Sequence, residues 1–154
     1  ILKSCGNIEG IVDMKNQFQN EFASKSLLRE NIMLGNALID IFGKCGELAK
    51  AQNLFEELPV RDVISWNSLI AGYVGQGLCN EALNCLELMQ REGLSPSILT
   101  LIGILRVCGS TGDIQKGKLI HSQFRSKDLL EKNTVIGNAL IDMYLESGVL
   151  GTAQ

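Results

Sequence analysis

The chain has 154 residues, an apolar fraction of 45% and a formal net charge of −3. This composition is ordinary for a globular protein, and two prolines leave no room for a long disordered linker. No apolar run approaches the roughly 20 residues of a membrane-spanning helix. The mild negative charge argues against indiscriminate nucleic-acid binding, which depends on a basic surface.

The five cysteines are odd in number and contain no Cys-x-x-Cys pair. We therefore expect reduced, packed thiols rather than a disulfide framework. These residues are Cys5, Cys45, Cys79, Cys85 and Cys108. The chain begins with Ile and shows no basic leader, so we expect it to be a fragment whose targeting segment is not included.

One six-residue segment occurs twice in the chain. Gly35–Asp40 reappears, residue for residue, as Gly137–Asp142, 102 residues later. A related pattern at 63–73 subdivides that interval, which gives units of 31, 35 and 36 residues. The units are 32–62, 63–97 and 98–133, with a partial unit before them at 1–31 and another after them at 134–154. Periods of this length indicate a repeat architecture.

Each unit is predicted to form two helices. In the first full unit, apolar residues at helical spacing lead to Gly46, and a second helix opens at Glu47 and ends at Pro59. The second unit follows the same plan, with apolar stripes over 69–74 and 81–89 and a stop at Gly93.

In the third unit, the pattern predicts a first helix over 101–107. Asp113 is then the expected N-cap of a second helix that runs to about Arg125. Alternating strand patterns are weak throughout. A lone hairpin cannot bury both of its helices, so we expect an all-α protein, an α-solenoid with a right-handed superhelix of helix-turn-helix hairpin repeats.

The units resemble the pentatricopeptide repeat family in its plant-type PLS form, which alternates standard, long and short motifs. The unit 32–62 carries GNALIDIFGKCG and resembles the short motif, and 63–97 carries VISWNSLIAGY and resembles the standard motif. The unit 98–133 carries LRVCGSTGDIQKGKLIH and resembles the long motif. By the same resemblance, 1–31 is a partial long motif and 134–154 a partial short motif. Plain tetratricopeptide arrays, the alternative helical repeat, keep one unit length.

This resemblance implies that the chain reads single-stranded RNA, one base per repeat. In the family, the fifth and last residues of a repeat select the base, and the second residue packs against it. The implied selecting residues are Asn36, Asp62, Asn67, Ser97 and Asn138. The implied packing residues are Met33, Ile64 and Val135.

The resemblance also implies a base for two units. Asn36 with Asp62 would favour U, and Asn67 with Ser97 would favour C. The third unit offers Ile102 and Asn133, and we assign it no base because Ile has no hydrogen-bonding head group. The family binds RNA parallel to the protein chain, so the expected register is 5′-U-C-N-pyrimidine-3′. An Asn amide carries both donors and an acceptor, which suits a pyrimidine edge.

Simpler roles compete with these assignments. Asn is a strong N-cap residue, so Asn36, Asn67 and Asn138 could instead begin the first helices. Their common phase in three units favours base readout. Trp66 could be a stacking platform, but its position in the repeat favours burial between helices. His121, the only histidine, is expected to pack within the second helix of its unit.

The segment Gly112–Lys118 has the spacing of a phosphate-binding loop. Leu119 stands where Ser or Thr would hold magnesium, and no strand precedes the segment, so we reject this interpretation. A cytidine deaminase would need H-x-E and C-x-x-C signatures, and the chain has neither. We therefore expect no enzyme, no metal and no cofactor in this segment, and any deaminase activity would require a C-terminal domain outside it.

The expected function is recognition of single-stranded RNA by part of a C-to-U editing factor in a mitochondrion or chloroplast. Roles in splicing or transcript maturation are weaker variants. The main alternative is a scaffold whose groove holds a partner polypeptide, such as another editing factor. We expect no membrane and no small-molecule substrate as partners. Each stacked base contributes about 1–3 kcal/mol and association costs about 4–15 kcal/mol, so this fragment alone is expected to bind weakly.

Overall fold

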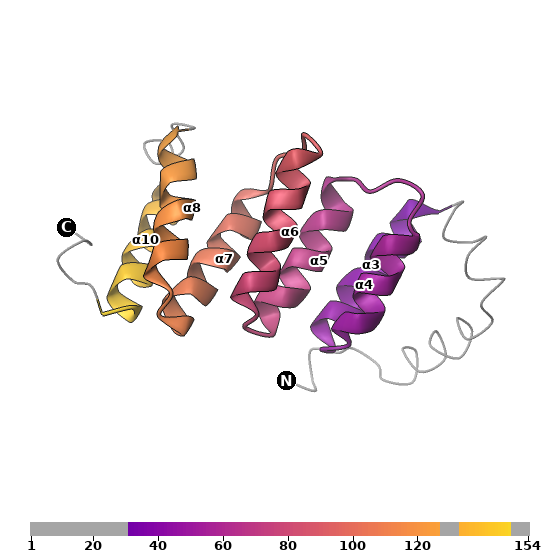
Figure 1. The fold of residues 1–154 in the computed structure, drawn as a ribbon, viewed down its shortest axis with the longest axis horizontal. Helices are drawn as coiled ribbons and strands as arrows, with labels where there is room; N and C mark the ends of the chain where they lie inside the picture. Colours follow the sequence, from indigo (N-terminus) through magenta and orange to yellow (C-terminus); the bar gives the residue numbers. More distant parts are fainter. Residues whose placement is uncertain (1–30, 127–132, 149–154) are drawn as a thin grey trace.

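The computed structural model describes residues 31–126 and 133–148, and this part of the chain contains α-helices and no strands (Figure 1). The helices are α3 (Ile32–Lys44), α4 (Leu48–Glu57), α5 (Val63–Gly75), α6 (Cys79–Arg91), α7 (Ile98–Thr111), α8 (Ile114–Ser126) and α10 (Thr134–Glu146). They form the hairpins α3/α4, α5/α6 and α7/α8, and α10 follows. The predicted all-α helical repeat is confirmed. The expected partial unit at 1–31 lies outside the described residues, apart from its last residue.

The first helix of every hairpin begins directly after a polar N-cap. These caps are Asn31, Asp62, Ser97 and Asn133, and each side chain accepts a hydrogen bond from a backbone N–H in the first turn. The strongest case is Asp62, whose carboxylate accepts from the Ser65 N–H at 2.8 Å, while the Ser65 hydroxyl accepts from the Asp62 N–H at 3.2 Å. This capping box satisfies donors that the helix cannot satisfy by itself.

Glycine and proline end the helices where the sequence predicts. Gly46 has φ 77° and Gly112 has φ 70°, a left-handed conformation that glycine adopts without steric cost. Leu58 is extended, with ψ 130°, because Pro59 follows it. The first helix of the third unit is longer than the predicted 101–107, since Ser97 caps it at one end and Gly112 stops it at the other.

The hairpins stack in sequence order along the long axis of the molecule (Figure 1). Consecutive first helices pack against each other, α3 on α5, α5 on α7 and α7 on α10. The second helices α4, α6 and α8 pack mainly on the first helices of their own and the following hairpins. The first helices therefore form an unbroken row, and one apolar core runs through the stack from Ile39 to Tyr144.

Trp66 belongs to this core, as predicted. Its side chain is 3% exposed, and its ring meets Phe55 edge-on with centroids 4.5 Å apart. The indole Nε1 donates to the Glu92 carboxylate at 2.9 Å, which satisfies the one polar group of the buried ring.

His121 also has a packing role. Its Nδ1 lies 2.9 Å from the Tyr144 hydroxyl, and the two rings meet edge-on with centroids 5.9 Å apart. This contact ties α8 to α10. No helix among the described residues has the length and apolar character needed to span a membrane.

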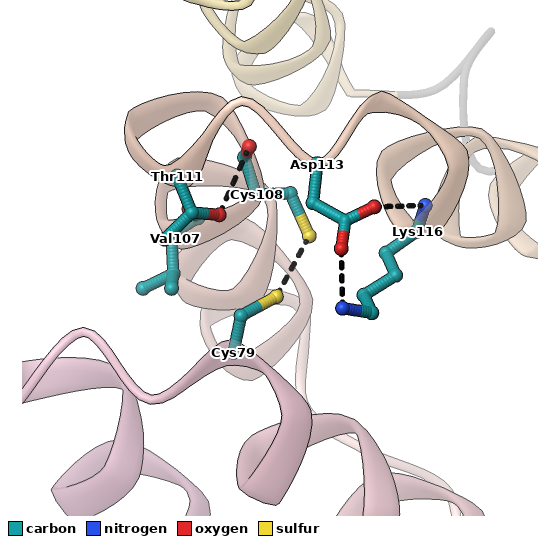
Figure 2. A network of polar contacts seen from close by, with 6 residues as sticks. All are labelled: Cys79, Val107, Cys108, Thr111, Asp113 and Lys116. Carbon is teal, nitrogen blue, oxygen red and sulfur yellow. Dashed lines mark hydrogen bonds and ion pairs between the residues drawn. The ribbon is translucent and has the colours of Figure 1, made fainter.

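None of the described cysteines forms a disulfide. Cys79, Cys85 and Cys108 are buried, as predicted, whereas Cys45 is exposed, because it follows the last turn of α3 at the surface. Cys5 lies outside the described residues. The Cys79 and Cys108 sulfurs are 3.3 Å apart between α6 and α7 (Figure 2). Burial raises the pKa of Cys85 to about 11 and raises that of Cys108 well above its ordinary value.

Candidate nucleic-acid interface

A row of exposed apolar side chains runs along the stacked first helices. The second residue of each unit is apolar and exposed: Met33 79%, Ile64 61%, Leu99 79% and Val135 56%. Single exposed apolar residues are common on proteins, but here the same position is exposed in four successive repeats. Three of these residues are the predicted packing residues, and the fourth, Leu99, belongs to the unit to which we assigned no base.

Two pockets lie between the members of this row. The first, of about 310 Å³, has Met33 and Ile64 in its lining. The second, of about 420 Å³, has Ile64 and Leu99 in its lining. Ile64 therefore contributes to both pockets. The row divides the surface into successive compartments of similar chemistry.

Each pocket contains one of the predicted selecting pairs. Asn36 and Asp62 line the first pocket, and Asn67 and Ser97 line the second. The members of each pair are 26 and 30 positions apart in the sequence and meet because each unit ends at the N-cap of the next hairpin. The stacking of hairpins thus brings together the residues that the sequence analysis paired.

In the first pocket, Asn36 is held by two partners. Its Nδ2 donates to Asp62 Oδ1 at 3.1 Å, and its Oδ1 accepts from the Ser65 hydroxyl at 2.6 Å. A carboxylate only accepts hydrogen bonds, so the reversed amide would bring two acceptors together. The amide orientation of Asn36 is therefore fixed. The residue is also nearly buried, with 5% of its surface exposed.

The same contacts set the charge state of Asp62. Partial burial acts to raise the pKa of Asp62, but hydrogen bonds from the Ser65 N–H, the Ser65 hydroxyl and the Asn36 amide outweigh it, and the pKa falls below its usual value. Asp62 is therefore a carboxylate at neutral pH. It supplies acceptor oxygens to the first pocket.

In the second pocket, a hydroxyl connects the selecting pair. Thr100 Oγ1 donates to Asn67 Oδ1 at 2.8 Å and lies 2.8 Å from the Ser97 hydroxyl. Ser97 in turn accepts from the Thr100 N–H at 3.1 Å as the N-cap of α7. Thr100 in this junction corresponds to Ser65 in the preceding one, since both are the third residue of their unit.

The next junction is apolar at the same positions. Ile102 replaces the asparagine and is 6% exposed, and Ile136 replaces the hydroxyl residue and is fully buried. Both belong to the apolar core. Asn133, the last residue of this unit, caps α10 by accepting from the Val135 N–H at 3.0 Å. Asn138 lies exposed on α10, and the residues that would close a pocket around it are beyond the described part of the chain.

The N-cap alternative for the asparagines is wrong. Asn36, Asn67 and Asn138 lie inside their helices, one turn past the residues that cap them. The capping roles belong to Asn31, Asp62, Ser97 and Asn133. The sequence analysis assigns Asp62 and Ser97 only as selecting residues. The patterns Asp62-x-x-Ser and Ser97-x-x-Thr carry that signal. Leu99 is also absent from the predicted packing residues, although its place as second residue of its unit identifies it.

The other candidate sites do not form in the described part of the chain around these two pockets. Asp40 lines both pockets but is paired with Lys44 at 2.6 Å. The segment that mimics a phosphate-binding loop is the start of α8, where Asp113 caps the helix and pairs with Lys116 (Figure 2). Within residues 31–126 and 133–148, no three His, Cys, Asp or Glu side chains gather as metal ligands would.

Comparison with known proteins gives consistent matches. A model described as the PPR repeat family matches residues 61–110, and one described as a PPR repeat matches residues 36–63. The chain is 32% identical over 151 residues to the Arabidopsis thaliana pentatricopeptide repeat-containing protein At4g18520, chloroplastic, covering 96% of this chain and 24% of that protein. It is 33% identical over 157 residues to At1g77170, mitochondrial, from the same plant, covering 100% of this chain and 33% of that protein.

A solved structure shares the fold. The crystal structure of the pentatricopeptide repeat protein PPR10 from maize matches with a TM-score of 0.71 and 23% sequence identity, over 94% of this chain and 21% of that chain. The chain thus spans a third or less of the length of these similar proteins.

Proposed function

Because the chain belongs to the pentatricopeptide repeat family, we propose that it binds single-stranded RNA and holds one base in each pocket between successive hairpins. The observation that carries this proposal is the recurrence of one arrangement: an amide from the first helix, a polar N-cap from the next hairpin, and an exposed apolar residue on either side. Base and backbone recognition of a single strand needs such evenly spaced sites.

The apolar row supplies the walls of these sites. A base in the first pocket packs between Met33 and Ile64, and the next base packs between Ile64 and Leu99. Every base has an apolar face, so this contact contributes affinity without choosing a sequence. The third unit, which lacks a polar selecting residue, contributes Leu99 to this packing.

The polar groups of each pocket determine which base it selects. In the first pocket, the Asp62 carboxylate is the acceptor, which suits the N3–H of uracil. In the second pocket, the Asn67 oxygen is occupied by Thr100, so the amide presents its N–H donors to the base. Cytosine offers acceptors at N3 and O2. The two pockets therefore select U in the first and C in the second.

The wider assignment follows the family. We assign 32–62, 63–97 and 98–133 as short, standard and long motifs, and 1–31 and 134–154 as partial long and short motifs. The local target is then 5′-U-C-N-pyrimidine-3′, with Asn138 and Val135 at the last position. The whole protein is proposed to select sites for C-to-U editing in an organelle, since two similar proteins are named chloroplastic and mitochondrial.

The test is a change of base preference. The block 32–133 is placed in a longer array of repeats, and binding is compared for RNAs that differ only at the base facing the second pocket. Exchanging Asn67→Thr together with Ser97→Asp is expected to shift the preference from C toward G, because guanine presents N–H donors to the new carboxylate. Unchanged selectivity in this variant would favour a polypeptide as the occupant of the groove.

A further inference from the structure

The two hydroxyl residues at the hairpin junctions have a role that the selecting pairs do not explain. We propose that Thr100 is a positioning residue: it fixes the amide of Asn67 so that the oxygen faces the protein and the N–H donors face the bound base. In the preceding junction, the Ser65 hydroxyl bonds the amide oxygen of Asn36. This inference rests on the proposed RNA binding and adds a third residue to each recognition site.

Counting hydrogens gives the direction of the bonds in the second pocket. The Thr100 hydroxyl has a single hydrogen, and it lies toward Asn67 Oδ1 at 2.8 Å. The 2.8 Å contact between Thr100 and Ser97 must therefore use the hydrogen of Ser97. Ser97 is free to give it, because its oxygen accepts from the Thr100 N–H. Helix capping thus fixes the direction of a series of hydrogen bonds, from Ser97 to Thr100 and from Thr100 to the oxygen of Asn67.

The first pocket has the same arrangement with stronger restraints. Ser65 is fully buried, and its hydroxyl lies 2.6 Å from Asn36 Oδ1 and 2.9 Å from Asp62 Oδ1. Its single hydrogen is shared between these two acceptors, and the shorter contact is the one to Asn36. Asp62 then takes the Asn36 N–H on the other side. In both junctions, the third residue of the following unit bonds the amide oxygen of the fifth residue.

The third junction provides an internal comparison. There the fifth residue is Ile102, which has no amide to orient, and the third residue of the following unit is Ile136, which has no hydroxyl. Both side chains are buried in the core instead. The amide and the hydroxyl are present together in two junctions and absent together in the third, as expected if one serves the other.

The consequence for recognition is specific. With Thr100 in place, Asn67 offers donors, which match N3 of cytosine and oppose the N3–H of uracil. Without the hydroxyl, the half-buried amide can rotate and present either its oxygen or its nitrogen. Cytosine and uracil then bind equally well, while packing against Ile64 and Leu99 is unchanged. Thr100 therefore governs the choice between the two pyrimidines and not the total affinity.

The experiment measures this choice directly. The full chain is titrated with two labelled short RNAs that differ only by C or U at the position facing the second pocket, and binding is followed by fluorescence anisotropy. The intact chain is expected to prefer C by about three- to tenfold, the range of one hydrogen bond. Thr100→Val, which keeps the shape of the side chain, is expected to bring the ratio to about one. Thr100→Ser retains the hydroxyl and keeps the preference.

A matched control lies on the same helix. Thr111→Val also removes a hydroxyl from α7, but that hydroxyl bonds only the backbone of its own helix (Figure 2). This variant is expected to retain the preference for C. Circular dichroism of all variants confirms that the helices are formed.

The outcomes separate the two proposals. If Thr100→Val keeps the preference for C, or weakens both RNAs by the same factor, the positioning role is wrong and RNA binding stands. If the intact chain binds neither RNA, even at the highest concentration reached, the proposed function fails, and the role of Thr100 fails with it.

Discussion

Gly43 on α3 and Gly72 on α5 face each other so closely that a methyl group added to Gly43 would lie 2.9 Å from the Cα of Gly72. The reciprocal methyl group on Gly72 would meet Gly43 at the same distance. Real Cβ atoms do not approach backbone this closely. The two first helices can therefore stack at this spacing only while both positions lack a side chain.

We predict that Gly43→Ala destabilises the chain by about 1–3 kcal/mol, because the helices must separate to admit the methyl group. Urea unfolding followed by circular dichroism measures this change. Gly75→Ala is the control, since Gly75 ends the same helix as Gly72 and a methyl group there meets nothing within 4 Å. Equal midpoints for Gly43→Ala and Gly75→Ala would contradict the close crossing.

Removing the Ser65 hydroxyl is expected to cost stability as well as specificity. Ser65→Ala leaves the buried oxygen of Asn36 without its donor, and an unsatisfied buried acceptor costs about 1–3 kcal/mol. Ser68→Ala, one turn later on α5 and half-buried, is expected to leave the thermal midpoint nearly unchanged. If the two variants had the same thermal midpoint, the hydroxyl of Ser65 would contribute nothing to the stability of the fold.

Asp62 gives the chain a defined response to acid. Its pKa is lower in the folded state than in the unfolded chain, so the unfolded state binds the proton more tightly. The stabilisation is fully present above the ordinary pKa of an aspartate, about 3.9, and is lost as the pH falls through the lower folded value. We expect Asp62→Asn to weaken the pH dependence of the melting temperature in this acidic window. An identical dependence in both proteins would show that Asp62 is not the group responsible.

The thiols are expected to differ sharply in reactivity. Burial raises the pKa values of Cys85 and Cys108, so neither forms the reactive thiolate near neutral pH, whereas Cys45 is exposed. Brief alkylation of the native chain, read by peptide mass spectrometry, should modify Cys45 far ahead of these two. Rapid modification of Cys108 would mean that the junction between α6 and α7 opens readily.

The apolar row should matter for RNA and not for folding. Ile64→Ala is expected to lower RNA affinity by about fivefold, because the shorter side chain packs less apolar surface against both adjoining bases. The melting temperature should not change, since the Ile64 side chain is exposed. Ile70 on the same helix is fully buried, and Ile70→Ala should instead destabilise the fold by about 2–5 kcal/mol. Destabilisation by Ile64→Ala would place that residue in the core.

Local patterns in the sequence are sufficient to predict the hairpins. Gly46, Pro59 and Gly93 end helices by their own backbone preferences, and the burial of Trp66 follows from its place in the repeat. The family resemblance pairs Asn36 with Asp62, and their side chains are hydrogen-bonded in the fold. These features depend on residues close in the chain or on the repeat pattern that carries the resemblance.

The remaining features depend on how neighbouring hairpins meet. The partner of Asn67 is Thr100, 33 residues away, and the partner of Gly43 is Gly72, 29 residues away. Nothing in the local pattern indicates which side chains face each other at that crossing. The capping roles of Asp62 and Ser97 escape prediction for another reason: the family resemblance suggests only a selecting role for each residue.

The two polar junctions share no hydrogen-bonding group, although both draw on α5. Ser65 points back to α3 and Asn67 points forward to α7, with the buried Trp66 between them in the chain. Changes at sites without shared partners combine almost independently. If the proposed RNA binding holds, a mutation that changes the base selected by one pocket is therefore expected to leave the selection in the adjoining pocket unchanged, and such an array can acquire new targets by single substitutions.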